Sequence, residues 1–211
     1  MLIRRLIPAI CLIALSGSIF AQSNDNPGVR IGIKGGLSVA TIIKSGDNSF
    51  STDPLLGFNG GVELQLPIGN VIAIQPEVLF SQKGYHTTGS AFGNDYDYRR
   101  YLNFLDIPIL LRINASKGFG IVLGPQYSYL LGTHNKFKTS NATIEQDVNN
   151  DNDNIRKNIF GGVIGADINV SRNLFIYGRY TVDFKNNNGD GTSTTPTYKN
   201  QVFQGGIGIL F

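Results

Sequence analysis

Two histidines are the only side chains in the sequence that could act as a base near neutral pH. His86 and His134 both lie in segments that we expect to be long loops. Hydroxyl groups that a histidine could activate occur at Ser45, Ser49, Ser51, Ser81, Ser90 and Ser128. A catalytic triad is defined by its geometry, which the sequence alone does not supply. Two solvated loop histidines are therefore favoured, and no catalytic residue is assigned.

A run of acidic and amide side chains forms the second pattern with a chemical use. Oxygen-bearing side chains recur at every second residue at Asp147, Asn149, Asp151 and Asp153. Calcium-binding loops use oxygen ligands at this spacing, with Gly at the sixth position and Glu at the twelfth. Here those positions hold Asn152 and Asn158. A polar loop is favoured over a weak calcium site, and we expect no cofactor.

Composition excludes several classes of function. The chain has 211 residues, with 18 Lys and Arg against 15 Asp and Glu. Arg4 and Arg5 lie in a stretch without acid, so residues 22–211 hold 16 basic and 15 acidic residues. This balance argues against a nucleic-acid partner, which would need a basic surface. Cys11 is the only cysteine, so disulfides and thiolate chemistry are excluded beyond it.

The first 21 residues predict a cleaved signal peptide. Met1–Arg5 is positively charged, Leu6–Phe20 is apolar, and Ala21 is a small residue at the expected cleavage site. The apolar run has about 15 residues, fewer than the roughly 20 that a spanning helix needs. We expect export, a polar leader at 22–28, and a single domain at 29–211.

Eight segments of alternating apolar and polar residues predict eight β-strands. The segments are Val29–Ile43, Leu56–Leu66, Val71–Lys83, Arg100–Ile113, Gly118–Leu131, Asn158–Val170, Leu174–Phe184 and Asn200–Phe211. Each has the length that a tilted strand needs to cross a bilayer. Short gaps alternate with long gaps, which we expect to be loops, at 44–55, 84–99, 132–157 and 185–199. This layout predicts an all-β fold, an eight-stranded antiparallel up-and-down transmembrane β-barrel.

The polar faces of the segments carry charged residues of both signs. They are Arg30, Lys34, Glu63, Glu77, Lys83, Asp106, Arg112, Asp167, Arg179 and Asp183. We expect these ten side chains to point into the barrel and to pair, because an unpaired buried charge is costly. An eight-stranded barrel is only wide enough inside for side chains. A self-compensated polar interior is therefore favoured over a conduit or a gate.

Aromatic residues on the apolar faces are sorted by barrel end. Those expected near the long loops are Phe58, Phe80, Tyr101, Tyr127, Tyr129, Phe160, Tyr180, Phe184 and Phe203, and those expected near the short turns are Phe119 and Phe211. Outer-membrane barrels carry an aromatic girdle at each interface. Asn103 departs from this pattern, since it is a polar residue on the expected lipid face.

Several stretches together resemble the PorT-like outer-membrane β-barrel family. They are IGIKGGL at 31–37, IQPEVLFSQKG at 74–84, YLNFLDIPILL at 101–111, GRY at 178–180 and the final Phe211. The resemblance spans essentially the whole chain after the signal peptide and implies an eight-stranded outer-membrane barrel. One member of that family is associated with assembly of a protease-exporting secretion system. The family supplies no catalytic residues, and the final Phe resembles the signal read by the barrel-assembly machinery.

The favoured hypothesis is a non-enzymatic barrel of the cell outer membrane that anchors four long extracellular loops. Expected partners are outer-membrane lipid and lipopolysaccharide, the barrel-assembly machinery during insertion, and secretion-system or surface partners at the loops. Three alternatives stay open: a lipid A-modifying barrel enzyme, a soluble periplasmic ligand-binding barrel, and a small solute channel.

Overall fold

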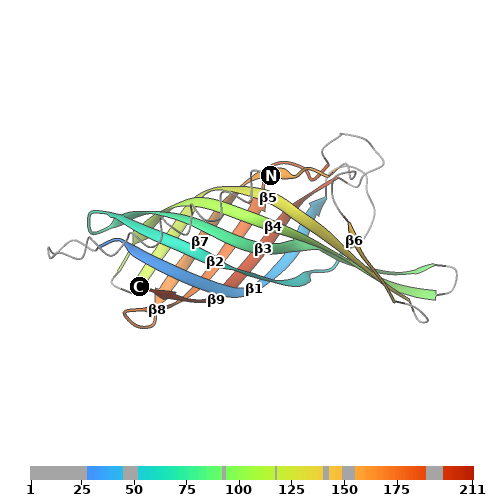
Figure 1. The fold of residues 1–211 in the computed structure, drawn as a ribbon, viewed down its shortest axis with the longest axis horizontal. Coiled ribbons are helices and arrows are strands. Elements are labelled where there is room, and N and C mark those ends of the chain that lie inside the picture. The colour runs from blue at the N-terminus through green and yellow to red at the C-terminus, as the bar shows by residue number, and fades with distance from the viewer. Residues whose placement is uncertain are drawn as a thin grey trace, which may run out of the picture.

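In the computed structural model, eight antiparallel strands close into a barrel (Figure 1). One further short strand, β6, pairs with β5 and extends one end of the barrel. The structure describes residues 28–44, 52–91, 94–116, 118–139, 143–148, 155–188 and 197–211. The strands are β1 (Arg30–Lys44), β2 (Leu55–Ile68), β3 (Ile72–Ala91), β4 (Asn94–Asn114), β5 (Phe119–Thr139), β6 (Thr143–Val148), β7 (Asn158–Asn169), β8 (Leu174–Asp183) and β9 (Tyr198–Leu210). Over these ranges, no helix is long and apolar enough to cross a membrane. The predicted signal peptide at 1–21 and most of the leader at 22–28 lie outside the described residues.

The ring is closed by pairing of the first strand with the last. β1 pairs with β2 on one side and with β9 on the other, from Gly32 opposite Leu210 to Lys44 opposite Tyr198. β4 pairs with β5, so the order around the ring is β1, β2, β3, β4, β5, β7, β8, β9. The predicted antiparallel up-and-down barrel is confirmed.

The two ends of the barrel differ in their connections. At one end, which we call the short-turn end, β2, β4 and β7 turn directly into the next strand. The first of these turns uses Gly69 at φ +80°, a left-handed conformation that favours glycine. The opposite end, which we call the long-loop end, carries the longer segments and the hairpins of β3–β4 and β5–β6 (Figure 1).

The structure corrects two of the predicted loops. Strands β3, β4 and β5 have 20, 21 and 21 residues and continue well past the predicted strand ends. The predicted loop at 84–99 is mostly a hairpin, and the predicted loop at 132–157 contains β6 paired with β5. Outside a membrane neither face of a strand must be apolar, so the alternation that marks the other strands is absent here. We call residues 84–91, 94–101, 132–139 and 143–148 the outer sheet.

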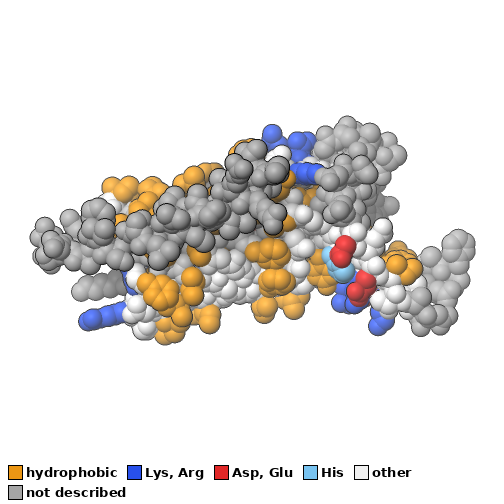
Figure 2. Space-filling view, in the orientation of Figure 1, with side chains coloured by type: hydrophobic (Ala, Val, Ile, Leu, Met, Phe, Trp, Pro, Cys, Tyr) orange, Lys and Arg blue, Asp and Glu red, His pale blue; other side chains and the backbone are white. Residues whose placement is uncertain are grey.

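The barrel has an apolar outside and a polar inside. On β1, Leu37 is 60 % exposed, whereas the next residue, Ser38, is fully buried. The same alternation brings apolar side chains outward on every strand of the ring, and Figure 2 shows them along the visible wall, with charged groups toward the ends. A soluble ligand-binding barrel requires the reverse, because its outer wall faces water and its cavity holds an apolar ligand. This polarity argues against the soluble alternative.

Asn103 keeps its outward direction but has a polar neighbour. The register of β4 against β5 shifts between Asn103 and Phe104, which marks a bulge. Across the β3–β4 pair, Gln82 Nε2 donates a hydrogen bond of 3.1 Å to Asn103 Oδ1. The amide on the expected lipid face is therefore satisfied by a second amide.

Closure of the ring depends on glycine at Gly36. A Cβ there would lie 2.1 Å from the Gly205 carbonyl oxygen of β9, whereas a Cβ at Gly35 would meet nothing closer than 3.8 Å. We predict that Gly36→Ala separates β1 from β9 and destabilises the barrel by about 1–3 kcal/mol, while Gly35→Ala leaves it unchanged. The measurement is the temperature at which the compact band on an unboiled gel converts to the unfolded band. Equal unfolding temperatures for the two variants would contradict the proposed need for glycine where β1 pairs with β9.

Candidate functional site

The barrel lumen is the candidate site, because it holds most of the charged side chains expected to face inward. Strand β3 lines it from the short-turn end upward with Gln75, Glu77, Leu79, Ser81, Lys83 and Tyr85, all of them buried. The period of two along a strand puts each of these side chains on one face. The polar members contact side chains from other strands at successive levels of the lumen, so we describe the lumen level by level along β3.

The first group, which we call the Glu77 cluster, joins four strands. Lys34 Nζ lies 2.6 Å from Glu77 Oε1 and 2.8 Å from Glu63 Oε2. Arg179 donates from Nη1 to Glu77 Oε2 at 2.8 Å. The four side chains are at most 1 % exposed where they pair, and two positive charges face two negative charges. The cluster is therefore balanced.

The second group, the Lys83 cluster, lies six residues further along β3, toward the long-loop end. Lys83 Nζ lies 3.3 Å from Asp106 Oδ1 and 3.4 Å from Asp183 Oδ1, and it donates to Ser128 Oγ at 3.0 Å. Asn200 Nδ2 donates to the other oxygen of Asp183 at 2.7 Å. One ammonium group thus bridges carboxylates from β4 and β8 across the lumen.

A third pair lies toward the short-turn end. Arg112 contacts Asp167 through Nη1, and its Nε donates to Asn114 Oδ1 at 3.0 Å. Gln75 links this pair to the Glu77 cluster, since it accepts from Arg112 and donates to Glu77 Oε1 at 2.8 Å. Arg30 is placed differently: it is half-buried at the mouth and donates to the Arg172 carbonyl.

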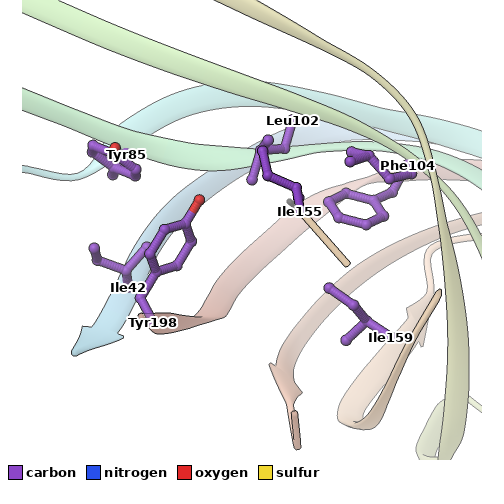
Figure 3. Packing of buried hydrophobic residues seen from close by; sticks show 8 residues of the cluster. Ile42, Tyr85, Leu102, Phe104, Ile155, Ile159 and Tyr198 are labelled. Atoms are coloured by element: carbon purple, nitrogen blue, oxygen red, sulfur yellow. The ribbon is translucent and has the colours of Figure 1, made fainter. Parts of the chain in front are cut away.

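Above the charged groups, apolar side chains fill the lumen at the long-loop end. Figure 3 shows them directed toward one another from several strands. The buried members are Ile42, Tyr85, Leu102, Phe104, Leu130, Ile155, Ile159 and Tyr198, and we call them the apolar plug. The Lys83 ammonium lies 4.6 Å from the centre of the Phe104 ring, so the plug rests directly on the charged groups. Among the described residues, the charged groups and the plug occupy successive levels of the lumen above its short-turn end.

Neutral polar residues link the charges, and the sequence reasoning missed their role. Gln75, Ser128 and Asn200 are buried and hydrogen-bonded to charged partners, and Tyr177 donates to Asn59 Oδ1 at 2.6 Å. The sequence contains a signal for these residues, because they occupy the same alternate positions along the strands as the charged side chains.

The expected girdle residues all lie outside the lumen. Several form close pairs between neighbouring strands: Phe58 with Phe80 at 5.2 Å, Tyr127 with Phe160 at 5.3 Å and Tyr180 with Phe203 at 4.9 Å between ring centres. Tyr101, Tyr129 and Phe184 also stand outside, and Phe119 and Phe211 are exposed near the short-turn end. Aromatic pairs thus occur on the outer wall at three strand pairs: β2 with β3, β5 with β7, and β8 with β9.

Both histidines lie on strands of the outer sheet, not in loops. His134 Nδ1 is 2.6 Å from Asp147 Oδ1, and His86 Nε2 is 3.0 Å from Asp97 Oδ2. Partial burial raises the pKa of Asp97, but hydrogen bonds from Arg99 and His86 outweigh it and hold that pKa below its usual value. Asp97 is therefore ionised at neutral pH.

Of the weak calcium candidates, only Asp147 is described. It is part of β6 and pairs with His134, while Asn149, Asp151 and Asp153 lie outside the described residues. In the described ranges, no group of three or more His, Cys, Asp or Glu side chains could hold a metal ion.

A groove of about 650 Å³ connects His134 to the apolar wall. Leu37, Leu56 and Phe58 form its apolar part, and His134, Lys136, Glu145 and Asp147 form its charged part. Lys136 Nζ lies 2.6 Å from Glu145 Oε1. Tyr101 is the only side chain with a hydroxyl among the described residues that line this groove.

The Glu77 cluster gives a prediction for stability. Glu77→Gln leaves Lys34 and Arg179 buried with less negative charge, and breaking a buried pair in this way costs about 3–5 kcal/mol. Glu145→Gln is the matched control, because its pair with Lys136 is exposed on the outer sheet, and we expect no change. Urea unfolding in detergent micelles measures both. A Glu77→Gln midpoint equal to that of Glu145→Gln would show that the cluster contributes nothing to stability.

Comparison with known proteins gives a family match and several similar solved structures. Residues 20–207 match the family described as outer membrane protein beta-barrel domain. Among solved structures, the chain is similar to Ail, the attachment invasion locus protein of Yersinia pestis, with 15% identity and a TM-score of 0.49 over 88% of this chain and 100% of that chain. It is also similar to Neisserial surface protein A (12% identity, TM-score 0.45, 89% of this chain and 100% of that one). OprG from Pseudomonas aeruginosa is similar too (12% identity, TM-score 0.44, 88% and 97%).

A search of curated proteins finds no match. The family match covers most of the chain, and the closed ring with its apolar outside and polar inside is the structure that such a domain requires. The chain therefore belongs to the outer membrane protein beta-barrel domain family.

Proposed function

We propose that this outer-membrane barrel is a sealed, non-enzymatic anchor that presents the outer sheet and its connecting segments to a partner outside the cell. The observation that supports the proposal is the packing of side chains across the lumen above its short-turn end. The Glu77 cluster, the Lys83 cluster and the apolar plug occupy successive levels of the barrel with almost fully buried side chains. A solute would have to break these ion pairs to pass, so this arrangement argues against the small solute channel.

The outer sheet supplies a surface suited to a polar partner. It continues β3, β4 and β5 beyond the apolar wall and adds β6. Its outward face carries charges of both signs, including Arg99, Lys136 and Lys138 beside Asp97 and Glu145. Interspersed charges of this kind favour specificity through electrostatic complementarity. A secretion component or a surface ligand is the partner we propose.

The route to the membrane is part of the same proposal. A signal peptide at 1–21 would direct export, and the barrel-assembly machinery would insert the chain, with Phe211 as part of its signal. Lipid and lipopolysaccharide would contact the apolar wall, and the aromatic side chains on that wall would lie at the two interfaces. The order of motifs on β1, β3 and β4 supports a PorT-like relationship, which would make a secretion system the first partner to test.

A second candidate function is favoured by one observation. His134 is oriented by Asp147 through Nδ1, and it borders a groove that continues onto the apolar wall. A histidine held by a carboxylate can act as a general base, so a lipid A-modifying enzyme remains the competing proposal. The described part of the groove offers no serine to complete such a site.

Conductance tests the anchor proposal. In planar bilayers we expect the folded protein to give no steady channel, with a general porin as the positive control. A variant in which residues 134–148 are replaced by a short Gly-Ser turn should also stay silent, because the seal lies inside the barrel. Steady conductance steps from the natural chain would overturn the proposal. Conductance steps from the shortened chain alone would show that the outer sheet, and not the lumen, blocks the passage of ions.

The enzyme alternative is tested by His134→Ala. We expect the lipid A mass spectrum to be the same in cells with the natural chain, the variant, or no copy of the protein. The physical reason is that the described lining of the groove contains a base, His134, but no serine for it to activate. A lipid A species that appears with the natural chain and disappears in both other strains would establish the enzyme and refute the anchor.

A further inference from the structure

The short-turn end of the lumen opens into a cavity of about 280 Å³ that none of the functions above uses. Its walls include Arg30, Gln65, Arg112, Asn114 and Asn169. A more open groove of about 640 Å³ adjoins it, shares Arg30 and Asn169, and adds Arg172. We call the two together the vestibule.

The vestibule is basic, unlike the rest of the lumen. Three guanidinium groups contribute to it, from Arg30, Arg112 and Arg172. Among the described residues that line either part, none is Asp or Glu. Arg112 is paired with Asp167, as the cations of the clusters higher in the lumen are paired with carboxylates, so the additional positive charge at this end comes from Arg30 and Arg172.

The donors of the vestibule are held in place before any ligand arrives. Arg112 is 4 % exposed, and Asp167 and Asn114 fix its guanidinium. Glycine at 120 makes room for it, since a Cβ there would lie 2.6 Å from Arg112 Nη2. Arg30 is fixed in turn by the carbonyl of Arg172. Pre-organised groups of this kind lose little conformational entropy when they bind.

We propose that the vestibule binds an oxyanion, a phosphate or carboxylate group carried by a small soluble molecule on the periplasmic side. Guanidinium groups bind such anions through paired N–H donors, and side-chain amides supply further donors. A cavity of this size accepts a small polar molecule. Its lining residues lie at the short-turn end and include none of the exposed large apolar side chains of the wall, so a soluble ligand fits it better than a membrane lipid.

The test uses the folded full-length mature protein in detergent, with inorganic phosphate and succinate as separate probes. A ligand that binds only the folded state raises the unfolding midpoint, so each probe is compared with chloride at equal ionic strength. We expect at least one probe to raise the midpoint, and the probe with the larger effect identifies the chemistry. Arg30→Gln should weaken the apparent affinity by about tenfold or more, because it removes a charged donor.

Two further variants keep the test decisive. Arg172 lies in an exposed turn, so Arg172→Gln replaces Arg30→Gln in the binding test if Arg30→Gln does not fold. Lys138→Gln is the control, since it removes a positive charge from an exposed residue of the outer sheet, at the opposite end. Loss of the response in the arginine variants, with Lys138→Gln unchanged, supports the site. The absence of any response in the natural chain, or an equal response in all variants, overturns it.

Discussion

Pairing of β1 with β9 is the interaction on which the rest of the structure depends. In hydrocarbon, each backbone N–H and C=O needs a partner within the protein, and an open sheet edge has none. The thirteen residue pairs from Gly32 opposite Leu210 to Lys44 opposite Tyr198 remove that edge. They require close approach of the two backbones at Gly36 and Gly205. Only in the closed ring do side chains from opposite walls meet in the lumen, as Lys34 and Arg179 do at Glu77.

Closure with eight strands also determines what the interior must contain. The lumen is too narrow for a water channel, so its side chains must satisfy one another. Lys34, Glu77 and Arg179 come from three different strands and meet only because the ring brings opposite walls together. Such a network gives the barrel a polar interior without a path for solutes. The anchor function that we propose follows from this seal.

The two ends of the barrel then serve different purposes. At the long-loop end, β3, β4 and β5 extend beyond the apolar wall and, together with β6, carry charges of both signs. At the short-turn end, the lumen ends in a vestibule lined by Arg30, Arg112 and Arg172, of which Arg112 is paired with Asp167. The apolar plug and the charged clusters separate these two ends, so a ligand at one end has no open route to the other.

The sequence by itself determined the fold class, the inward and outward faces, and the eight strands of the ring. A strand that faces lipid on one side and a crowded lumen on the other must alternate, and this alternation is visible in single segments such as Ile33 to Val39. The sequence did not reveal the outer sheet. Residues such as Thr87 and Thr88 lie on a projecting hairpin beyond the apolar wall, where no environment imposes alternation.

Only the tertiary structure decided which charges meet. The sequence supplied five basic and five acidic inward candidates, but any pairing across the lumen depends on strand order and register. Register places Arg112 beside Asp167, while Arg30, at the start of β1, remains at the mouth with a backbone partner. In the same way, His134 and Asp147 are thirteen residues apart in sequence and became neighbours because β5 and β6 form a hairpin. Alternation identifies the face of a strand, whereas contacts between strands are a property of the closed ring.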